Sequence, residues 1–372
     1  MRVPLSTACV TEHPESNRDE RLARLIRPEI LALRSYAVAD ASGRIKLDAM
    51  ENPYSWPPNL IPGWQRLLAT SPLNRYPDAP APALVDALRC KLALPEGQSL
   101  LLGNGSDEII QMLTLALRRD LSVLAPTPTF VMYEMSAKVV GVPYSGVPLD
   151  PGFSLNADKL LDAAQRTHAG LIFIAYPNNP TGNLFDSGEI ERVIRNTRAL
   201  VVVDEAYFPF ARRTFMDRIG EFDNLLVMRT FSKEGLAGLR LGFLAGNRNW
   251  IDAIDKLRLP YNINRLTQLT ATFALEHADM LDAQAERIRA DRELLFDALS
   301  AIPTVQPWPS DANFILFSVA RCDEVFKGLL DRGVLIKNLS GSGLPGFLRV
   351  TVGTKEENHF FLQALRDVLA ES

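Results

Sequence analysis

The sequence predicts an α/β fold with a large, mainly parallel sheet sandwiched by helices and a second, smaller α+β domain. Residues 100–250 alternate short apolar runs, rich in β-branched residues, with amphipathic helical stretches. Residues 313–372 instead alternate strands and helices in a different order, which indicates a separate unit. The chain has 372 residues, which is too long for one small domain and is typical of two or three.

Five apolar runs are the predicted strands of the large sheet. Because each run is apolar throughout and does not alternate, helices should cover both faces of the sheet. Such sheets bind ligands at the carboxyl ends of their strands. The polar segments PTPTF, YPNNPTG, DEAY and RTFSK follow four of these runs, so one site should be assembled from several loops. The runs are Ser122–Ala125, Leu171–Ala175, Leu200–Val203, Leu225–Met228 and Leu241–Ala245.

The flanking segments complete the predicted organisation. The first 20 residues are polar and are predicted to be a loose tail, followed by a short helix over Arg21–Leu33. The Pro-rich segment ENPYSWPPNLIP is a crossing segment rather than a regular element. Residues 265–300 are predicted to form one long helix or two. The predicted boundaries are 1–20 for the tail, 21–59 for an N-terminal arm and part of the small domain, 60–262 for the large domain and 263–372 for the small domain.

Composition and charge favour an ordinary globular protein of the cytoplasm. Hydrophobic residues make up 47% of the chain, and 40 basic against 44 acidic residues give a net charge of −4. This balance predicts no surface for nucleic acid, and no apolar run approaches the roughly 20 residues that span a bilayer. The cysteines Cys9, Cys90 and Cys322 are scattered, as are the four histidines, so neither a disulfide framework nor a metal site is predicted.

The segment LGNGSDEII, which begins at Leu102, predicts an anion-binding turn. Gly105, Ser106 and Asp107 precede an apolar helical pattern, and the free N–H groups of a helix N-terminus bind phosphate. An ordinary helix cap by Ser106 or Asp107 is the alternative. The segment GSGLPG at 341–346 matches a dinucleotide fingerprint only by chance, because a strand and not a helix follows it.

Two strand ends carry residues suited to catalysis. Asp204 closes the apolar run LVVV, where a carboxylate needs a cationic partner. An ion pair, an Mg²⁺ ion or the pyridinium nitrogen of a cofactor would each serve. Lys233 is suited to form a Schiff base, although most lysines at strand ends are simply solvated. Ser232 and Arg240 add a hydroxyl and a guanidinium suited to phosphate.

Four motifs in a fixed order point to a known family. In YPNNPTG, Asn178 or Asn179 could donate to a phenolate oxygen, or the segment could be a plain turn. The order GSDE, YPNNPTG, DEAY and SK-x₆-R resembles the fold-type I pyridoxal-phosphate enzymes, the aminotransferases of classes I and II. The segments LDAMENPYSWP, LNRYPD, RTFSKEGLAGLRLG and LRVTVGTKEEN are similar to the histidinol-phosphate aminotransferases among them, from about residue 25 to the C-terminus.

The resemblance implies pyridoxal 5′-phosphate as the cofactor and a role for each matching residue. Lys233 would bind the cofactor covalently and transfer the proton, and Asp204 would pair with the ring nitrogen. Phe130 would stack on the ring, at a place where the family often has tyrosine. The other implied cofactor contacts are Asn179 and Tyr207 at the ring oxygen, Gly105, Ser106, Asp107, Ser232 and Arg240 at the phosphate, and Tyr54 reaching the phosphate from the partner subunit.

The resemblance also implies a homodimer with active sites at its interface and an anionic substrate. Arg349 would bind the substrate's phosphate or carboxylate, and Tyr36 and Asn313 would complete the substrate contacts. Lys337 stands where many family members carry an arginine that helps to bind the substrate phosphate. Lysine keeps the charge of arginine but loses its bidentate fork.

The implied reaction transfers an amino group between L-histidinol phosphate and 2-oxoglutarate, giving imidazole acetol phosphate and L-glutamate, in histidine biosynthesis. Two alternatives are an aromatic amino acid aminotransferase and a lyase similar to threonine-phosphate decarboxylases. A third is a non-catalytic pyridoxal-phosphate binder of the kind found in regulators. Those carry a DNA-binding module for which residues 1–20 are too few, and the intact pair of Lys233 and Asp204 also argues against it.

Overall fold

The computed structural model describes residues 15–33 and 38–371. The chain divides into two compact units, residues 1–39 and the remainder from Asp40 onward, and each is described by itself.

The first unit contains two short helices, α1 (Glu15–Leu25) and α2 (Pro28–Leu31). The predicted single helix over Arg21–Leu33 is wrong, because Pro28 occupies the start of α2. Proline suits the first turn of a helix but interrupts one that continues through it. α1 already begins at Glu15, within the segment predicted as a loose tail, and the rest of that tail lies outside the described residues.

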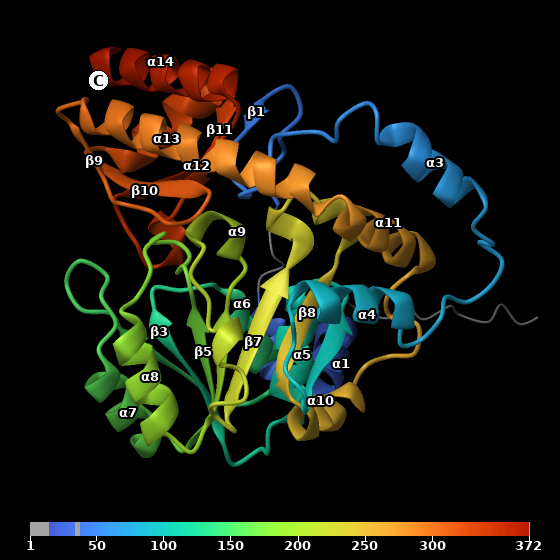
Figure 1. The fold of residues 1–372 in the computed structure, drawn as a ribbon. Helices are drawn as coiled ribbons and strands as arrows, with labels where there is room; N and C mark the ends of the chain where they lie inside the picture. Colours follow the sequence, from blue (N-terminus) through green and yellow to red (C-terminus); the bar gives the residue numbers. More distant parts are fainter. Residues whose placement is uncertain (1–14, 34–37, 372) are drawn as a thin grey trace, which may run out of the picture. The chain divides into compact units, whose positions relative to one another are not determined.

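A seven-stranded sheet is the centre of the second unit (Figure 1). Its order is β2-β8-β7-β6-β5-β3-β4, and among these strands β8 runs antiparallel to both of its neighbours. The five predicted strands are confirmed as β3, β5, β6, β7 and β8. The apolar runs of the sequence did not predict β2 or the half-exposed edge strand β4. The bounds are β2 Gln98–Gly103, β3 Ser122–Thr127, β4 Tyr144–Pro148, β5 Ala169–Ala175, β6 Leu200–Asp204, β7 Leu225–Thr230 and β8 Gly242–Asn247.

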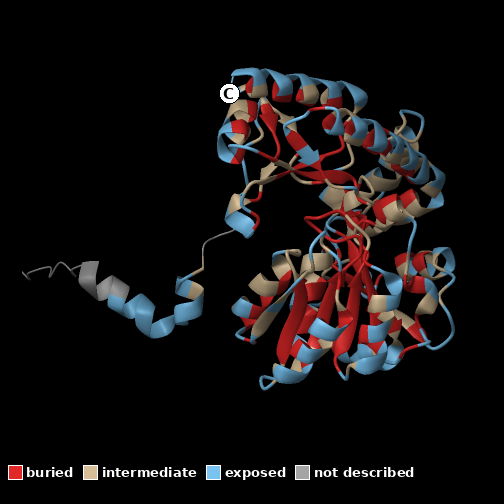
Figure 2. Ribbon diagram, turned by 90° about the vertical axis from the view of Figure 1, so that its left-hand side faces the viewer, coloured by how far each residue is buried: buried red, intermediate tan, exposed pale blue. Residues whose placement is uncertain are grey.

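Helices cover both faces of this sheet, and the strands between them are buried (Figure 2). Along β5, Ile172 and Ile174 pack with α4, α7, α8 and α11, whereas Leu171 and Phe173 pack with α5, α6 and α10. This alternation follows from the two-residue period of a strand, and it explains why every position of β5 is apolar. The bounds are α3 Ile61–Ala69, α4 Pro82–Lys91, α5 Ser106–Ala116, α6 Met132–Val140, α7 Ala157–Arg166, α8 Ser187–Asn196, α9 Phe208–Ala211, α10 Arg248–Asp255 and α11 Arg265–Glu276.

The small domain combines an early segment of the chain with its C-terminal part. β1 (Ile45–Lys46) pairs in parallel with β11 (Val334–Leu335), and a four-stranded antiparallel sheet has the order β12-β13-β10-β9. Three helices pack on these strands through one apolar cluster. The bounds are β9 Val305–Pro307, β10 Phe314–Val319, β12 Lys337–Asn338, β13 Phe347–Thr351, α12 Ala278–Ser300, α13 Cys322–Asp331 and α14 Lys355–Glu371.

The packing of α11 bears on the predicted boundary between residues 60–262 and 263–372, which stays a prediction. Residues 265–300 form two helices, and the buried residues Ala271 and Ala274 of α11 pack in the core of the large domain, not in that of the small one. Conversely, Tyr207 and Phe210 follow a strand of the large sheet but pack in the small-domain core. The apolar core around the seven-stranded sheet therefore includes residues of α11.

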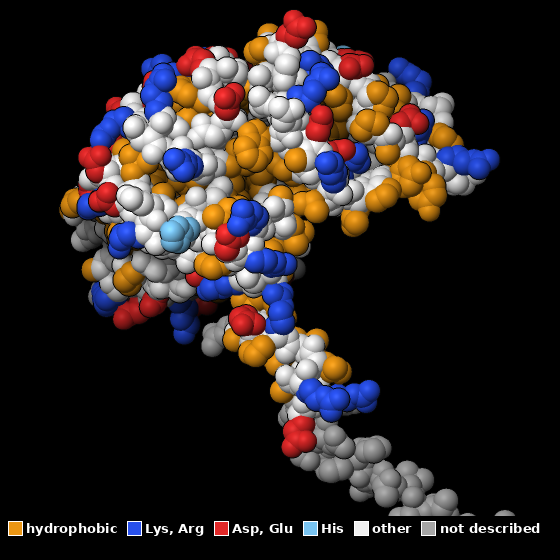
Figure 3. Space-filling model, turned by 90° about the horizontal axis from the view of Figure 1, so that it is seen from below, with side chains coloured by type: hydrophobic (Ala, Val, Ile, Leu, Met, Phe, Trp, Pro, Cys, Tyr) orange, Lys and Arg blue, Asp and Glu red, His pale blue; other side chains and the backbone are white. Residues whose placement is uncertain are grey.

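The surface carries both signs of charge. On the face shown in Figure 3, basic and acidic side chains are interspersed with apolar ones. Among the described residues, no helix combines the length and the apolar character that crossing a membrane requires.

Candidate active site

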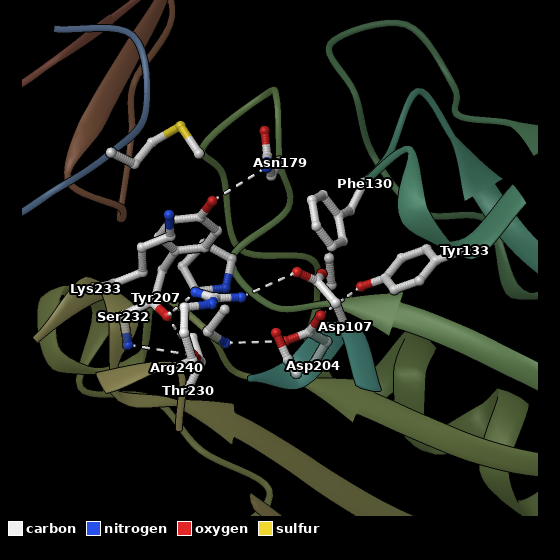
Figure 4. Close-up of a pocket in the computed structure, with 15 residues that line it drawn as sticks. Asp107, Phe130, Tyr133, Asn179, Asp204, Tyr207, Thr230, Ser232, Lys233 and Arg240 are labelled. Carbon is white, nitrogen blue, oxygen red and sulfur yellow. Dashed lines mark hydrogen bonds and ion pairs between the residues drawn. The ribbon is translucent and has the colours of Figure 1, made fainter. Parts of the chain in front are cut away.

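A cavity lies where β5, β6 and β7 end, beside the N-terminus of α5 (Figure 4). Motifs far apart in the sequence meet here because parallel strands end on the same edge of a sheet. The predicted site residues that line the cavity are Ser106, Asp107, Phe130, Asn179, Asp204, Tyr207, Ser232, Lys233 and Arg240. The remaining lining residues are Met50, Tyr133, Ala175, Pro177, Ala206 and Thr230.

One end of the cavity is suited to an anion. α5 begins at Ser106, directly after Gly105, whose φ of 84° is in the left-handed region. A Cβ atom at Gly105 would lie 2.7 Å from Nη2 of Arg240, so a larger residue would displace the guanidinium. Arg240 Nη1 donates to the Ser232 hydroxyl at 3.3 Å, and Nη2 lies 3.3 Å from the Asp107 carboxylate. Helix N–H groups, a hydroxyl and a guanidinium together form a phosphate-binding set.

Asp204 supplies a buried carboxylate to the cavity. The Tyr133 hydroxyl donates to Oδ2 at 2.7 Å, and the Ala206 N–H donates to Oδ1 at 3.1 Å. Burial raises the pKa of Asp204 to about 6, although both hydrogen bonds lower it. A cation placed against this carboxylate would offset the cost of burying its charge.

Lys233 also lines the cavity (Figure 4). Its Nζ donates to the carbonyl of Ala49 at 2.9 Å. Burial, and then the nearby charge of Arg349, lower the pKa of Lys233 to about 8. A larger fraction of this amine is therefore neutral near pH 8 than in an ordinary lysine, and the neutral amine is the nucleophilic form.

This shift gives a prediction for the cofactor-free protein. Acylation of Lys233 by an amine-reactive reagent should approach half of its maximal rate near pH 8, because the neutral form accumulates through a pKa of about 8. Peptide mass spectrometry across a pH series measures this rate for Lys233 alone. The urea-unfolded chain is the control, and its Lys233 should require a pH nearer 10.5, the ordinary value. Coincident profiles for the folded and unfolded chains would contradict the prediction.

An aromatic ring and a hydrogen-bonding pair complete the cavity. Phe130 lines it and meets Tyr133 edge to face, with ring centroids 5.6 Å apart. The side-chain amide of Asn179 donates to the Tyr207 hydroxyl at 3.1 Å. Asn178, the other candidate in YPNNPTG, instead binds the Pro128 carbonyl at 3.0 Å and the Thr181 hydroxyl at 2.7 Å, so its amide is structural.

The predicted substrate residues of the small domain adjoin the cavity without lining it. Arg349 donates to the side-chain oxygen of Asn179 and, at 2.9 Å, to the carbonyl of Asp48. Asn313 donates to the carbonyl of Met50 at 3.0 Å. Lys337 stands directly opposite Arg349 in the antiparallel pairing of β12 with β13.

One described residue that was predicted at the site, Tyr54, is not brought to the cavity. The Tyr54 hydroxyl donates to Asp291 of α12 at 3.0 Å, and the guanidinium of Arg287 lies over its ring. Burial and Asp291 raise the pKa of Tyr54 to about 12. Tyr54 thus contacts the small domain of its own chain, and its predicted contact with a partner's cofactor stays a prediction. Tyr36 lies outside the described residues.

Sequence reasoning missed Tyr133, Thr230 and Met50. Tyr133 is the second aromatic residue of PTPTFVMY, and its place three positions after Phe130 is the one signal that could have revealed it. The Thr230 hydroxyl accepts from the Ser232 N–H at 3.2 Å. The spacing of threonine and serine in the motif TFSK is the local signal for this turn. No pattern signals Met50, because its position depends on the fold of both domains.

The arrangement of these groups corresponds to a known family. The family model described as aminotransferase class I and II matches residues 42–365, which include every described residue discussed at the site. The chain belongs to this family. The family's fold type I, with a large, mostly parallel sheet between helices, is the fold predicted from the sequence, and it is confirmed.

Named relatives and solved structures agree with this assignment. The chain is 53% identical to "Histidinol-phosphate aminotransferase 2" of Nitrosococcus oceani, over 93% of this chain and 98% of the relative. It is 49% identical to "Histidinol-phosphate aminotransferase 1" of Ralstonia nicotianae, over 95% and 97%. The Sinorhizobium meliloti histidinol-phosphate aminotransferase, solved in complex with pyridoxal-5′-phosphate, superposes with a TM-score of 0.83 at 21% identity, covering 93% of this chain and 98% of that one. At that identity, the superposition shows the fold alone.

Proposed function

We propose that this chain is a pyridoxal-phosphate-dependent histidinol-phosphate aminotransferase, which exchanges an amino group between L-histidinol phosphate and 2-oxoglutarate in histidine biosynthesis. The observation that carries the substrate assignment is the register of Lys337 opposite Arg349. The names of the relatives at 53% and 49% identity support the same assignment.

The paired cations favour a doubly charged group. Residues directly opposite on antiparallel strands project to the same face, and like charges placed there repel each other. A phosphate dianion between them would offset this repulsion, and one carboxylate would do so less fully. Arg349 is also bonded to Asn179, which lines the cavity, so an anion held by Arg349 would lie beside the reacting centre.

The lining residues fit pyridoxal phosphate in charge and chemistry. Ser106, Asp107, Ser232 and Arg240, with the free N–H groups of α5, would hold its phosphate. Asp204 would hold a protonated ring nitrogen, whose positive charge offsets the burial of the carboxylate. The remaining implied contacts are Phe130 on the ring face, Asn179 and Tyr207 at the ring oxygen, and Gly105, which leaves room for Arg240.

Lys233 would carry out the proton transfer. When bound, pyridoxal phosphate withdraws electrons from the α carbon of the amine donor and so acidifies its proton. The Lys233 amine, neutral in part near pH 8, would take that proton and return it to the adjacent carbon of the cofactor. The Ala49 carbonyl, 2.9 Å from Nζ, orients the amine.

A homodimer and a cytoplasmic location are part of the proposal. The loops 72–80 and 257–263 expose the apolar side chains Leu73, Tyr76 and Leu259, which are 72%, 77% and 70% exposed and are suited to a second copy. Tyr76 stacks on Tyr261 with ring centroids 4.4 Å apart, which fixes part of this surface. The free thiols of Cys90 and Cys322 are compatible with a reducing compartment.

A panel of amine donors with 2-oxoglutarate as the acceptor tests the function. The specificity constant kcat/KM should be highest for histidinol phosphate and lower for phenylalanine. Lys337→Ala should lower the constant for histidinol phosphate by about tenfold or more, since a hydrogen bond to a charged group contributes roughly 1.5–3 kcal/mol. Phenylalanine, which carries one carboxylate and no phosphate, should be affected less.

Lys337→Arg is the matched variant, because it keeps the charge and adds the fork, and it should retain or improve the activity with histidinol phosphate. An unchanged ratio of the two specificity constants in Lys337→Ala would remove Lys337 from the site. A wild type that prefers phenylalanine would overturn the substrate assignment. Release of CO₂ from threonine phosphate without a keto acid would indicate a decarboxylase instead.

A further inference from the structure

The segment Asp48–Met50, which we name the strap, is held by three predicted site residues. Its three successive carbonyls accept hydrogen bonds from Arg349, Lys233 and Asn313, in that order, at 2.9, 2.9 and 3.0 Å. Arg349 and Asn313 belong to the small domain and Lys233 to the large one. The strap therefore connects both domains at the proposed proton-transfer residue.

Met50 has an unusual backbone within the strap. Its φ of 53° lies in the left-handed region, which disfavours residues that carry a Cβ atom. The Thr351 hydroxyl accepts from the Met50 N–H at 3.0 Å, and Asn313 binds its carbonyl, so both polar groups of this residue are fixed. A strained conformation that its surroundings hold on both sides is a feature of functional segments.

The Met50 side chain borders the space for the substrate. Within the part of the chain that the structure describes, it is the one residue lining the cavity from outside residues 106–240. Apart from Gly105 and Tyr54, the proposed cofactor contacts come from that range. Met50 is 8% exposed and follows Ala49, whose carbonyl binds Lys233, so it lies beside the amine that must reach the donor's α carbon.

We propose that Met50 is a specificity-determining residue whose thioether contacts the ring of the amine donor. This inference rests on the proposed aminotransferase function. An unbranched thioether adapts to the shape of a bound group, and its sulfur makes favourable contacts with aromatic ring edges. Donors with an imidazole or phenyl ring gain this contact, and an amine without a ring does not.

The test uses the holoenzyme with Met50→Ala. The specificity constants for histidinol phosphate and phenylalanine should fall by about two- to tenfold, the range expected for losing a sulfur–aromatic contact. 2-Aminoethyl phosphate has the amine and the phosphate but no ring. Its inhibition constant should differ by less than about twofold between Met50→Ala and the wild type. Apparent dissociation constants from the cofactor's absorbance, without 2-oxoglutarate, should show the same difference between the ligands.

Two further variants separate the side chain from the backbone. Met50→Leu keeps an apolar side chain of similar size but has no sulfur, so its specificity constants for ring-bearing donors should lie between those of the wild type and Met50→Ala. Met50→Gly relieves the left-handed backbone, yet it should lose the same preference as Met50→Ala. Met280→Ala removes the same atoms from a partly buried methionine outside the cavity, and it should leave all of these constants unchanged.

The outcomes distinguish this inference from the proposed function. An equal change for every ligand in Met50→Ala would mean that Met50 only supports the structure, and no change would mean that it touches no ligand; either result overturns the inference. A wild type that prefers phenylalanine would overturn the proposed substrate. The role of Met50 would still be tested in that case, because phenylalanine also carries a ring.

Discussion

Lys233→Ala should lower kcat for amino transfer by about 10²–10⁴-fold, the range contributed by a positioned proton-transfer group. The loss should appear with every amine donor, because each donor must give its α-carbon proton to the Lys233 amine. Wild-type holoenzyme treated with borohydride should carry the cofactor irreversibly on Lys233, which peptide mass spectrometry detects. Steady-state kinetics with histidinol phosphate measures the loss.

Lys159→Ala is the matched control. Lys159 is an exposed lysine of α7 that pairs with Asp150, away from the cavity. Its replacement should leave both kcat and the borohydride label unchanged. A label found on another lysine, or normal turnover by Lys233→Ala, would refute the assignment of Lys233.

Asp204→Asn should lower kcat by about 10²–10³-fold, as removal of a preorganised electrostatic group does in other enzymes. The same substitution should stabilise the cofactor-free protein at pH 8. Burial raises the pKa of Asp204 from 3.8 to about 6 in the folded chain. The folded state therefore binds this proton more tightly than the unfolded state, and the free energy of unfolding falls by about 3 kcal/mol as the pH rises from 4 to above 6.

Asparagine has no charge to bury, so Asp204→Asn should melt at a higher temperature than the wild type at pH 8 and near the wild-type temperature at pH 4. Differential scanning calorimetry of both cofactor-free proteins measures the difference. Lower activity together with higher stability separates a functional role from a loss of folding. A lower melting temperature of Asp204→Asn at pH 8 would contradict the claim that the buried charge of Asp204 destabilises the cofactor-free protein.

The residues that sequence reasoning predicted are those with local signals. Asp204 and Lys233 each follow an apolar strand, and Ser106 opens a helix after a glycine turn, so their approximate positions follow from the chain itself. The parallel sheet then brings those strand ends together. β4 was not predicted because it has no such local signal. It is a short, half-exposed edge strand without a continuous apolar run.

Other features depend on contacts between distant segments. The hydrogen bond from Tyr133 to Asp204 joins α6 to β6, and the strap's carbonyls carry no side-chain signal at all. The contact of Tyr54 with Asp291 likewise could not be predicted, since α12 lies more than 200 positions later in the chain. The packing of α11 in the core around the seven-stranded sheet likewise depends on contacts between distant segments.

The pairing of β1 with β11 has a consequence for the order in which the ribosome makes this protein. All strands of the seven-stranded sheet have been synthesised once Asn247 has emerged from the ribosome. β1 cannot pair with β11 until Val334 has been synthesised, and the Leu47 carbonyl cannot accept its hydrogen bond until Thr351 has been synthesised. A nascent chain can thus assemble the sheet that holds Asp204 and Lys233 well before translation ends. Catalytic competence should arrive late, when the final strands hold Ala49 against the lysine.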